Sequence, residues 1–180
     1  MPLRSPTMPP KPILFAIDPG SRISGVAVYE GNRLVHWALL KVPSSRDPVQ
    51  RCLTMSAAIA EFINEVMKGE EDRTITVVVE LPGGRSNRWS RGLVTLGMAV
   101  GMIIAYLTAI GHRVVTLRAD EWTKLDGPRC LPKAVRAAKI EEMFPKYQSE
   151  EDKSLDGADA IGLGAYFLGL FKSDTPKEPE

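Results

Sequence analysis

In Ile13-Leu14-Phe15-Ala16-Ile17-Asp18-Pro19-Gly20-Ser21, an unbroken apolar run meets one acidic residue and then a turn. Five consecutive apolar residues are typical of a central strand that is buried on both faces. The Pro-Gly pair after Asp18 indicates a turn, because these residues favour the backbone angles that turns require. We therefore expect a buried strand that presents the carboxylate of Asp18 at its end.

The segments that follow alternate between strand-like and helix-like patterns. A hairpin is indicated at Glu30-Gly31-Asn32-Arg33, between two apolar segments of strand length. We expect the other strands at residues 23–29, 34–42, 74–79 and 113–117, and helices at residues 47–67, 88–110, 131–143 and 155–171. This order predicts an α/β domain with a five-stranded mixed sheet, its first three strands antiparallel, and helices on both faces.

Three further acidic residues stand at the ends of predicted elements. Glu80 follows the β-branched run of residues 75–79, while Asp156 and Asp159 lie three apart where the last helical pattern begins. Residues at i and i+3 share one helix face, so both aspartates can point toward the same site. Four carboxylates brought together would repel one another unless cations neutralised them.

An all-oxygen ligand set suits Mg²⁺ or Mn²⁺ rather than zinc. In two-metal phosphodiester hydrolysis, ions about 3.5–4 Å apart clamp the attacking and leaving oxygens. Asp18, on the middle strand, is the natural bridging ligand, and Glu80 would approach from the neighbouring strand. Small residues at 157, 158 and 160 leave room for the aspartate helix to lie close to the sheet.

Each acidic position has an ordinary explanation when it is taken alone. Asp-Pro-Gly after a strand is usually a turn, and acidic residues near a helix start usually complement the helix dipole. A Glu before Leu-Pro is more often a surface residue than a ligand. Their joint order along the predicted elements is what indicates a metal-dependent phosphoryl-transfer site.

The composition indicates one soluble globular domain. The chain has 180 residues, 44% of them hydrophobic and 25% charged, which is in the usual range. The net charge is only +1, but residues 81–140 hold ten basic and three acidic residues. Such asymmetry is expected of a surface that faces a polyanion, although a solvated helix face would produce the same count.

The cysteines and histidines form no recognisable site, and the two ends of the chain differ from its middle. Two cysteines and two histidines are too few and too far apart for a disulfide framework or a zinc site. Residues 1–12 contain five prolines and no apolar signal-peptide core, so we expect a disordered arm. We expect one folded domain at residues 13–171, a disordered tail at 172–180, and a cytoplasmic location.

The predicted helix after Glu80 is unusually apolar. Residues 93–110 carry no charge and include Gly97-x-x-x-Gly101, which is just long enough for a membrane span. A strand is predicted on each side of it, and a span there would destroy the domain, so we expect no membrane association. One face of this helix should cover the sheet, and the face with Gly97 and Gly101 could meet a second subunit. Burial within a single chain is the alternative.

These motifs together resemble the RuvC family of Holliday junction resolvases. Residues 15–22, Phe-Ala-Ile-Asp-Pro-Gly-Ser-Arg, are similar to the opening motif of that family, Val77-Val78-Val79-Glu80 to its second acidic position, and Asp156-Gly157-Ala158-Asp159-Ala160 to its C-terminal motif. The resemblance runs from Ile13 to about Leu170. It implies a ribonuclease H-like fold, a homodimer, and Mg²⁺-dependent paired nicking of four-way DNA junctions. It also implies that Asp18, Glu80, Asp156 and Asp159 are the catalytic metal ligands, with two ions per subunit and Mn²⁺ as a possible substitute.

The chain departs from the family pattern at its DNA-contacting positions. An aromatic residue is usual three positions after the catalytic Glu, where this chain has Gly83, and the usual lysine loop is altered around Lys124. A short, divergent chain with an N-terminal arm would suit a phage-type member acting in a host cytoplasm. The candidate DNA-binding residues are Arg22, Arg85, Arg88, Trp89, Lys124, Lys133 and Arg136, and the candidate dimer contacts are Gly97 and Gly101.

Two other functions remain open at the level of the sequence. One is a ribonuclease H-like nuclease that acts on flaps, other branched DNA or RNA, which the missing aromatic at Gly83 favours. The other is a catalytically silent DNA-binding dimer. The second is disfavoured because an inactive protein has no reason to keep four mutually repelling carboxylates.

Overall fold

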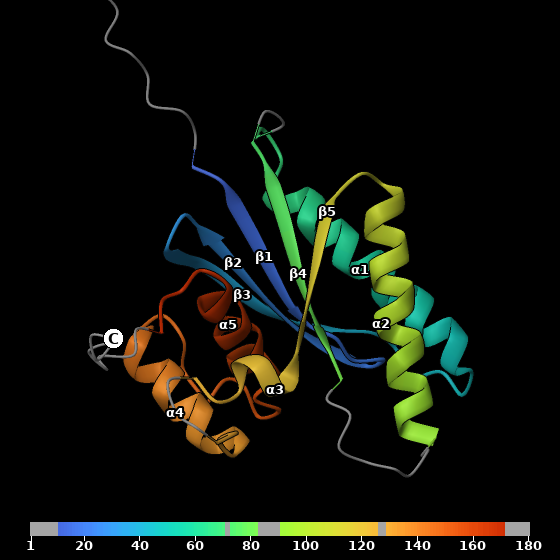
Figure 1. The fold of residues 1–180 in the computed structure, drawn as a ribbon. Helices are drawn as coiled ribbons and strands as arrows, with labels where there is room; N and C mark the ends of the chain where they lie inside the picture. Colours follow the sequence, from blue (N-terminus) through green and yellow to red (C-terminus); the bar gives the residue numbers. More distant parts are fainter. Residues whose placement is uncertain (1–10, 71–72, 83–90, 126–128, 172–180) are drawn as a thin grey trace, which may run out of the picture.

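A five-stranded mixed sheet forms the centre of the domain in a computed structural model, which describes residues 11–70, 73–82, 91–125 and 129–171. The strands are β1 (Ile13–Asp18), β2 (Ile23–Glu30), β3 (Arg33–Lys41), β4 (Ile75–Leu81) and β5 (Arg113–Arg118). They lie in the order β3-β2-β1-β4-β5 (Figure 1). β1, β2 and β3 are antiparallel to their neighbours, whereas β4 is parallel to β1 and β5 is parallel to β4.

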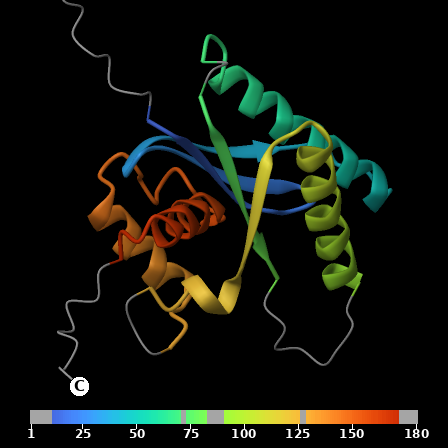
Figure 2. The same ribbon diagram turned by 45° about the horizontal axis from the view of Figure 1, so that its top comes forward.

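Helices cover both faces of this sheet. They are α1 (Pro48–Val66), α2 (Arg91–Ala109), α3 (Ala119–Trp122), α4 (Lys133–Met143) and α5 (Asp156–Phe167). α1 and α2 pack on one face, and α5, supported by α3 and α4, packs on the other (Figures 1 and 2). The chain therefore has the α/β, ribonuclease H-like architecture that its sequence predicts.

The middle strand explains why two hydrophobic cores form. In β1 successive side chains point to opposite faces, so Phe15 and Ile17 join the core beneath α1 and α2. Leu14 and Ala16 join the core beneath α5. Because both faces are covered, a continuous apolar run is the pattern that this position requires.

Local signals set the limits of the helices. The side chain of Asp47 accepts a hydrogen bond of 2.8 Å from the N–H of Val49 and caps α1, with Pro48 in its first turn. This is the position where proline costs least, because its missing N–H would have no partner inside the helix. Gly111 follows α2 with φ of +91°, a conformation that only glycine adopts readily.

The predicted order of strands and helices is confirmed, and most limits agree within two or three residues. α3 was not predicted, because four residues are too few to show a helical period. α5 ends at Phe167 rather than near residue 171, and Gly169 turns the chain there with φ of +67°. Residues 88–90 of the predicted second helix lie outside the described residues. Residue 11, which the sequence assigns to the arm, contacts the domain through its carbonyl, which accepts hydrogen bonds from Arg73.

Glycines allow α5 to lie directly on the sheet. A Cβ at Gly25 of β2 would overlap the backbone carbonyl of Asp156, and a Cβ at Gly157 would come within 2.8 Å of the indole of Trp37. Further along the helix, a Cβ at Gly164 would approach the ring of Tyr29 to 2.5 Å. The close approach expected from small residues in α5 is confirmed, and its counterpart in β2 is Gly25.

We predict that Gly25→Ala lowers the free energy of unfolding by about 1–3 kcal/mol, because the added methyl meets backbone that cannot move aside. Gly97→Ala is the matched control, since nothing lies within 4 Å of an added Cβ there. Alanine in an exposed helix should raise stability by about 0.5–1 kcal/mol. Urea unfolding of both variants checks this, and equal stability of Gly25→Ala and wild type would contradict the close contact.

Candidate active site

The parallel pair β1 and β4 brings Asp18 and Glu80 to one edge of the sheet. Ile17 lies opposite Val79 in the register, so the two acidic residues follow at matching positions. Both Ile17 and Val79 point into the core beneath α1 and α2. Asp18 and Glu80 therefore point to the other face, toward α5.

The first turn of α5 supplies Asp156 and Asp159. The turn before it is fixed by the fully buried carboxylate of Asp152, which accepts hydrogen bonds from the N–H of Ala158 at 3.0 Å and the hydroxyl of Tyr147 at 3.1 Å. Leu155 enters the helix with φ of +59°, a strained conformation for a branched residue that is often found beside functional sites. This turn determines where Asp156 and Asp159 lie.

Two cations of α4 lie inside the acidic group. Lys133 Nζ is 2.6 Å from Asp156 Oδ1 and 3.1 Å from Asp159 Oδ2. Arg136 donates from Nε at 3.0 Å and from Nη2 at 2.8 Å to Asp159 Oδ1, with only 11% of its side chain exposed. Both residues were predicted to bind DNA, and the structure gives them an internal role that the sequence did not reveal. Their contact with DNA stays a prediction.

Trp122 connects Glu80, at the edge of the sheet, with Arg136 of α4. Its Nε1–H donates a hydrogen bond of 3.0 Å to Glu80 Oε2, and its ring lies 5.2 Å from the guanidinium carbon of Arg136. The side chain is fully buried, which is usual for tryptophan when its N–H has a partner. Trp122 therefore links Glu80 to Arg136 and, through it, to Asp159.

The charges of the group perturb one another. Burial, and then Glu80, Asp159 and Asp156, raise the pKa of Asp18 well above its usual value, while Lys133 opposes the rise. Burial and Asp159 raise the pKa of Glu80 to about 7 against the opposing effects of Trp122, Arg136 and Lys133. Burial lowers the pKa of Lys133, but its hydrogen bond to Asp156 and the other nearby carboxylates outweigh this and raise it. Two cations thus compensate four carboxylates only in part.

The acidic group meets the chemical requirements of a site for hard cations, but not yet the geometric ones. Its donors are all oxygens, which Mg²⁺ and Mn²⁺ prefer, and the pKa values of Asp18 and Glu80 are raised first by burial and then by the neighbouring carboxylates. Across the described ranges, no three acidic, histidine or cysteine side chains are arranged to hold an ion as they stand. Lys133 and Arg136 occupy oxygens that an ion would need.

The other predicted site residues lie away from the acidic group or outside the described residues. Arg22 is exposed just after β1, and Lys124 is half-buried after α3. Gly97 and Gly101 lie on the exposed side of α2. Arg85, Arg88 and Trp89 lie outside the described residues, so their predicted DNA contacts stay predictions.

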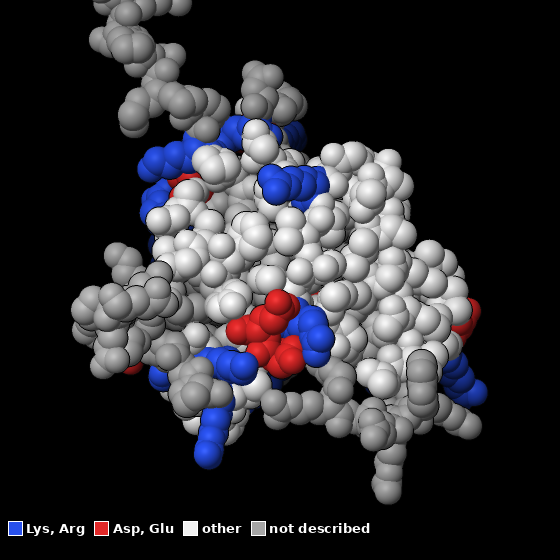
Figure 3. All heavy atoms as spheres, in the orientation of Figure 1, with Lys and Arg blue, Asp and Glu red and all other residues white. Residues whose placement is uncertain are grey.

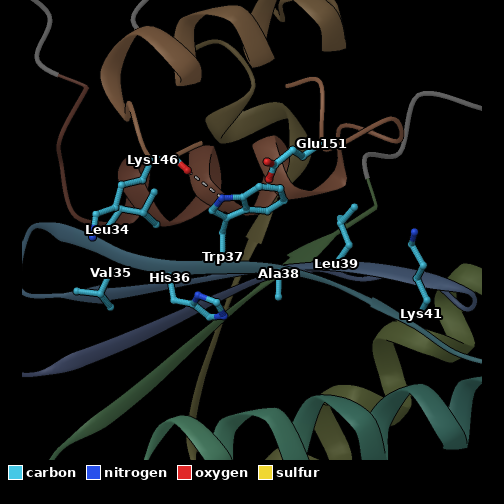
Figure 4. Close-up of a pocket in the computed structure, with 9 residues that line it drawn as sticks. All are labelled: Leu34, Val35, His36, Trp37, Ala38, Leu39, Lys41, Lys146 and Glu151. Atoms are coloured by element: carbon cyan, nitrogen blue, oxygen red, sulfur yellow. Dashed lines mark hydrogen bonds between the residues drawn. The ribbon is translucent and has the colours of Figure 1, made fainter. Parts of the chain in front are cut away.

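A hollow of about 820 Å³ along the edge strand β3 is separate from the acidic group (Figure 4). Trp37 and Glu151 point into it from the α5 side, and the indole N–H of Trp37 donates to the carbonyl of Lys146 at 3.3 Å. His36 and Ala38 point to the opposite face. Among the described residues, its lining includes none of the four carboxylates and no comparable cluster, so we do not assign it to catalysis.

Comparisons with known proteins agree with this architecture. No protein-family model and no curated protein matches the chain. Among solved structures, the chain resembles RuvC of Thermus thermophilus, with a TM-score of 0.62 and 18% identity over 88% of this chain and 93% of that one. The same protein in complex with a Holliday junction substrate matches with a TM-score of 0.61 and 17% identity, over 90% of this chain and 97% of that one.

A third similar structure is the yeast mitochondrial Holliday junction resolvase Ydc2, with a TM-score of 0.56 and 13% identity over 92% of this chain and 81% of that one. At such low identities, these likenesses establish the fold alone. The chain has the RuvC-type, ribonuclease H-like fold, which confirms the predicted resemblance at the level of architecture.

The raised pKa of Glu80 predicts a pH dependence of stability in the metal-free protein. Since folding raises this pKa from 4.5 to about 7, the folded chain binds more protons, and the free energy of unfolding falls as the pH rises across that interval. The loss is on the order of 3 kcal/mol at most. Glu80→Gln should remove it, so the variant gains stability relative to wild type between pH 5 and about pH 8.

Urea unfolding in EDTA at a series of pH values measures this difference. Glu61→Gln, on the exposed side of α1, is the matched control and should follow the wild-type profile. Parallel profiles for wild type and Glu80→Gln would mean that the Glu80 carboxyl titrates normally.

Proposed function

We propose that the chain is a Mg²⁺-dependent endonuclease that resolves four-way DNA junctions by paired, symmetric nicks. The observation that carries this proposal is the convergence of Asp18, Glu80, Asp156 and Asp159 from three separate segments at one sheet edge. The fold in which they converge is that of RuvC, which has been solved with a Holliday junction substrate. A structural protein would gain nothing from gathering partly compensated carboxylates in this way.

The four carboxylates would hold two divalent ions, with Asp18 between Glu80 on one side and the aspartates of α5 on the other. When bound, Mg²⁺ supplies charge neutralisation at the phosphate and a water that is easily deprotonated. The chain's own contribution is rigid placement: Asp18 and Glu80 are mounted on paired strands, and Asp152 fixes the turn that positions Asp156. Mn²⁺, with the same preference for oxygen ligands, is an expected substitute.

Of the two α4 cations, Lys133 would leave its carboxylate partners when the ions enter, whereas Arg136 would keep its own. The Lys133 ammonium is on a flexible side chain that is 37% exposed, so it can leave the aspartates and face the scissile phosphate, where a positive charge stabilises the transition state. Arg136 is held more tightly, because its Nη1 also donates to the carbonyl of Leu131 at 2.7 Å. We expect Arg136 to stay and orient Asp159, leaving Asp159 Oδ2 available.

A second copy of the chain would pack on α2. Buried side chains of this helix face the sheet, but Val94 and Tyr106, and Ile110 just after the helix, are 44–47% exposed. The outer surface of α2 is an uncharged area in Figure 3.

Residues 92–109 are long and apolar enough to cross a membrane, with 22% of that window buried. A span is incompatible with the fold, because the strands before and after α2, β4 and β5, pair with each other.

A nuclease with a different branched or RNA substrate is the alternative, favoured by glycine at position 83, where the RuvC family usually has an aromatic residue. A competition assay with a labelled four-way junction against flap, duplex and RNA–DNA hybrid competitors separates the two. Preferential cleavage of the junction, at symmetric positions on opposing strands, is the result we expect. Equal rates on all four substrates would favour the alternative.

We predict that Asp18→Asn reduces junction cleavage to less than a tenth of wild type, because one charge of the ion-binding set is removed. Junction affinity should stay level or rise, since repulsion of phosphate also falls. Asp120→Asn is the matched control, because this carboxylate pairs with Arg118 at the surface and should leave cleavage unchanged. Cleavage by Asp18→Asn above a tenth of wild type would contradict the bridging role.

We predict that Gly101→Arg yields monomers that nick junctions poorly and without pairing. A two-fold interface brings the same patch of both copies together, so a bulky charge on α2 is introduced twice. No atom lies within 4 Å of a Cβ at this position, so the isolated domain should stay folded by circular dichroism. Light scattering measures the mass, with Glu61→Arg on the outer side of α1 as control. Monomeric wild type that still nicks in pairs would remove the support for a dimer.

A further inference from the structure

Another hollow lies on the side of the sheet opposite the acidic group. Its volume is about 300 Å³, enough for roughly ten water molecules at about 30 Å³ each. Its lining residues come from the β1–β2 turn and from the first turns of α1 and α2, and Figure 1 shows where these elements lie. The residues that line it are Ser21, Arg22, Arg51, Gly92, Thr95 and Leu96.

The lining of this hollow is positively charged. Its described residues include two arginines and no acidic residue, and no carboxylate in the described part of the chain forms an ion pair with either arginine. Asp47, the acidic residue one turn before Arg51, uses Oδ1 to cap α1. The first turn of α2 has no acidic residue either, so the positive end of its dipole adds to the field.

Arg51 lacks a partner that its environment requires. Its Nη1 donates to the carbonyl of Ser45, but its Nε is buried and has no hydrogen-bond partner among the described residues. Leaving a buried donor of a charged group unpaired is costly, and native structures usually satisfy such groups. Nε itself is closed to solvent, but an oxyanion in the hollow would neutralise the Arg51 guanidinium, which lines it, and would also complement Arg22.

The position of the hollow relates it to the acidic group. Arg22 lies four residues after Asp18, so their Cα atoms are at most about 14 Å apart. At 3.4 Å of helix axis per nucleotide of one strand, this upper limit corresponds to at most about four nucleotides of duplex DNA. A DNA strand with its scissile phosphate at Asp18 could therefore cross the Pro19–Ser21 turn and place a nearby phosphate between Arg22 and Arg51.

We propose that this hollow binds one backbone phosphate of the cleaved DNA strand, within about four nucleotides of the cut. The inference rests on the proposed function as a DNA nuclease and adds an anchoring point to it. Ser21, Arg22 and Arg51 contact the phosphate and fix the path of the strand across the sheet edge. Because phosphates carry no base identity, this contact sets position and not sequence preference.

A scan of single neutral methylphosphonates along the cleaved strand of a four-way junction tests the inference, with binding measured in EDTA. In wild type, neutralising one phosphate within about four nucleotides of the cut should weaken binding about tenfold. Arg22→Gln and Arg51→Gln should each bind the unmodified junction about tenfold more weakly and lose nothing further at that position. Arg46→Gln, an exposed arginine on the loop before α1 that does not line the hollow, should behave like wild type.

Folding is controlled by Arg22→Gln, because the Arg22 side chain is exposed and its loss cannot unfold the core. The inference is overturned if, at every position of the scan, the methylphosphonate weakens binding by both variants as much as it weakens binding by wild type. If cleavage remains normal in that case, the proposed function stands. Absence of any junction binding by wild type would overturn both. The hollow could also take a free anion instead of DNA. In that case sulfate would raise the melting temperature of wild type but not of Arg51→Gln, and the effects of each arginine variant and each methylphosphonate on binding would simply add. This result also overturns the assignment to DNA.

Discussion

Electrostatic repulsion among carboxylates is the constraint around which this domain is organised. Asp18 and Glu80 end neighbouring buried strands, and Asp156 and Asp159 approach them from α5. Burial weakens solvation of each charge, so the pKa values of Asp18 and Glu80 are raised. Lys133 and Arg136 relieve part of this repulsion, and Trp122 connects the two halves. Neutralising one of these carboxylates relieves repulsion, whereas removing one of the two cations leaves its partners uncompensated.

The rest of the fold serves to keep these groups in place. α5 can bring its aspartates to the sheet only because Gly25 has no side chain and residues 157 and 158 are small. The buried Asp152 holds the turn before this helix. α1 and α2 cover the opposite face of the sheet, and their N-terminal ends border the positively charged hollow. At one edge of the sheet, the α5 side thus carries the acidic group and the side of α1 and α2 carries the positively charged hollow. This arrangement suits a ligand with one reacting phosphate and one anchored phosphate.

Much of the fold and of the acidic group could be predicted from the sequence, because the decisive signals are local. The apolar run before Asp18, the β-branched run before Glu80 and the hairpin at Gly31 each indicate their own structure, and their order indicates the sheet. The convergence of the acidic residues followed from strand ends and helix spacing. What could not be predicted depends on contacts between distant segments. The inward position of Arg136, the bond from Trp122 to Glu80 and the need for glycine at residue 25 leave no periodic pattern.

The same reasoning explains why the charge count of residues 81–140 combines two kinds of basic residue. The excess of basic residues between 81 and 140 indicated a surface facing a polyanion, yet Lys133 and Arg136 are paired inside the acidic group, and Arg118 is paired with Asp120. A sequence count cannot distinguish a cation that neutralises its own protein from one that awaits a ligand. Arg51 is the converse case, since it lies outside the basic segment and has an unpaired buried nitrogen.

The most direct test of this account is a titration of the folded, DNA-free protein with Mn²⁺, with bound ions counted by electron paramagnetic resonance. If the carboxylates form an ion site that Lys133 and Arg136 partly fill, wild type should bind about two ions per chain. Lys133→Ala should bind them more tightly, because a competing cation is gone, and Asp18→Asn should bind them more weakly. Wild-type protein that is folded by circular dichroism yet binds no Mn²⁺ at millimolar concentration, with Lys133→Ala behaving the same, would contradict the central claim.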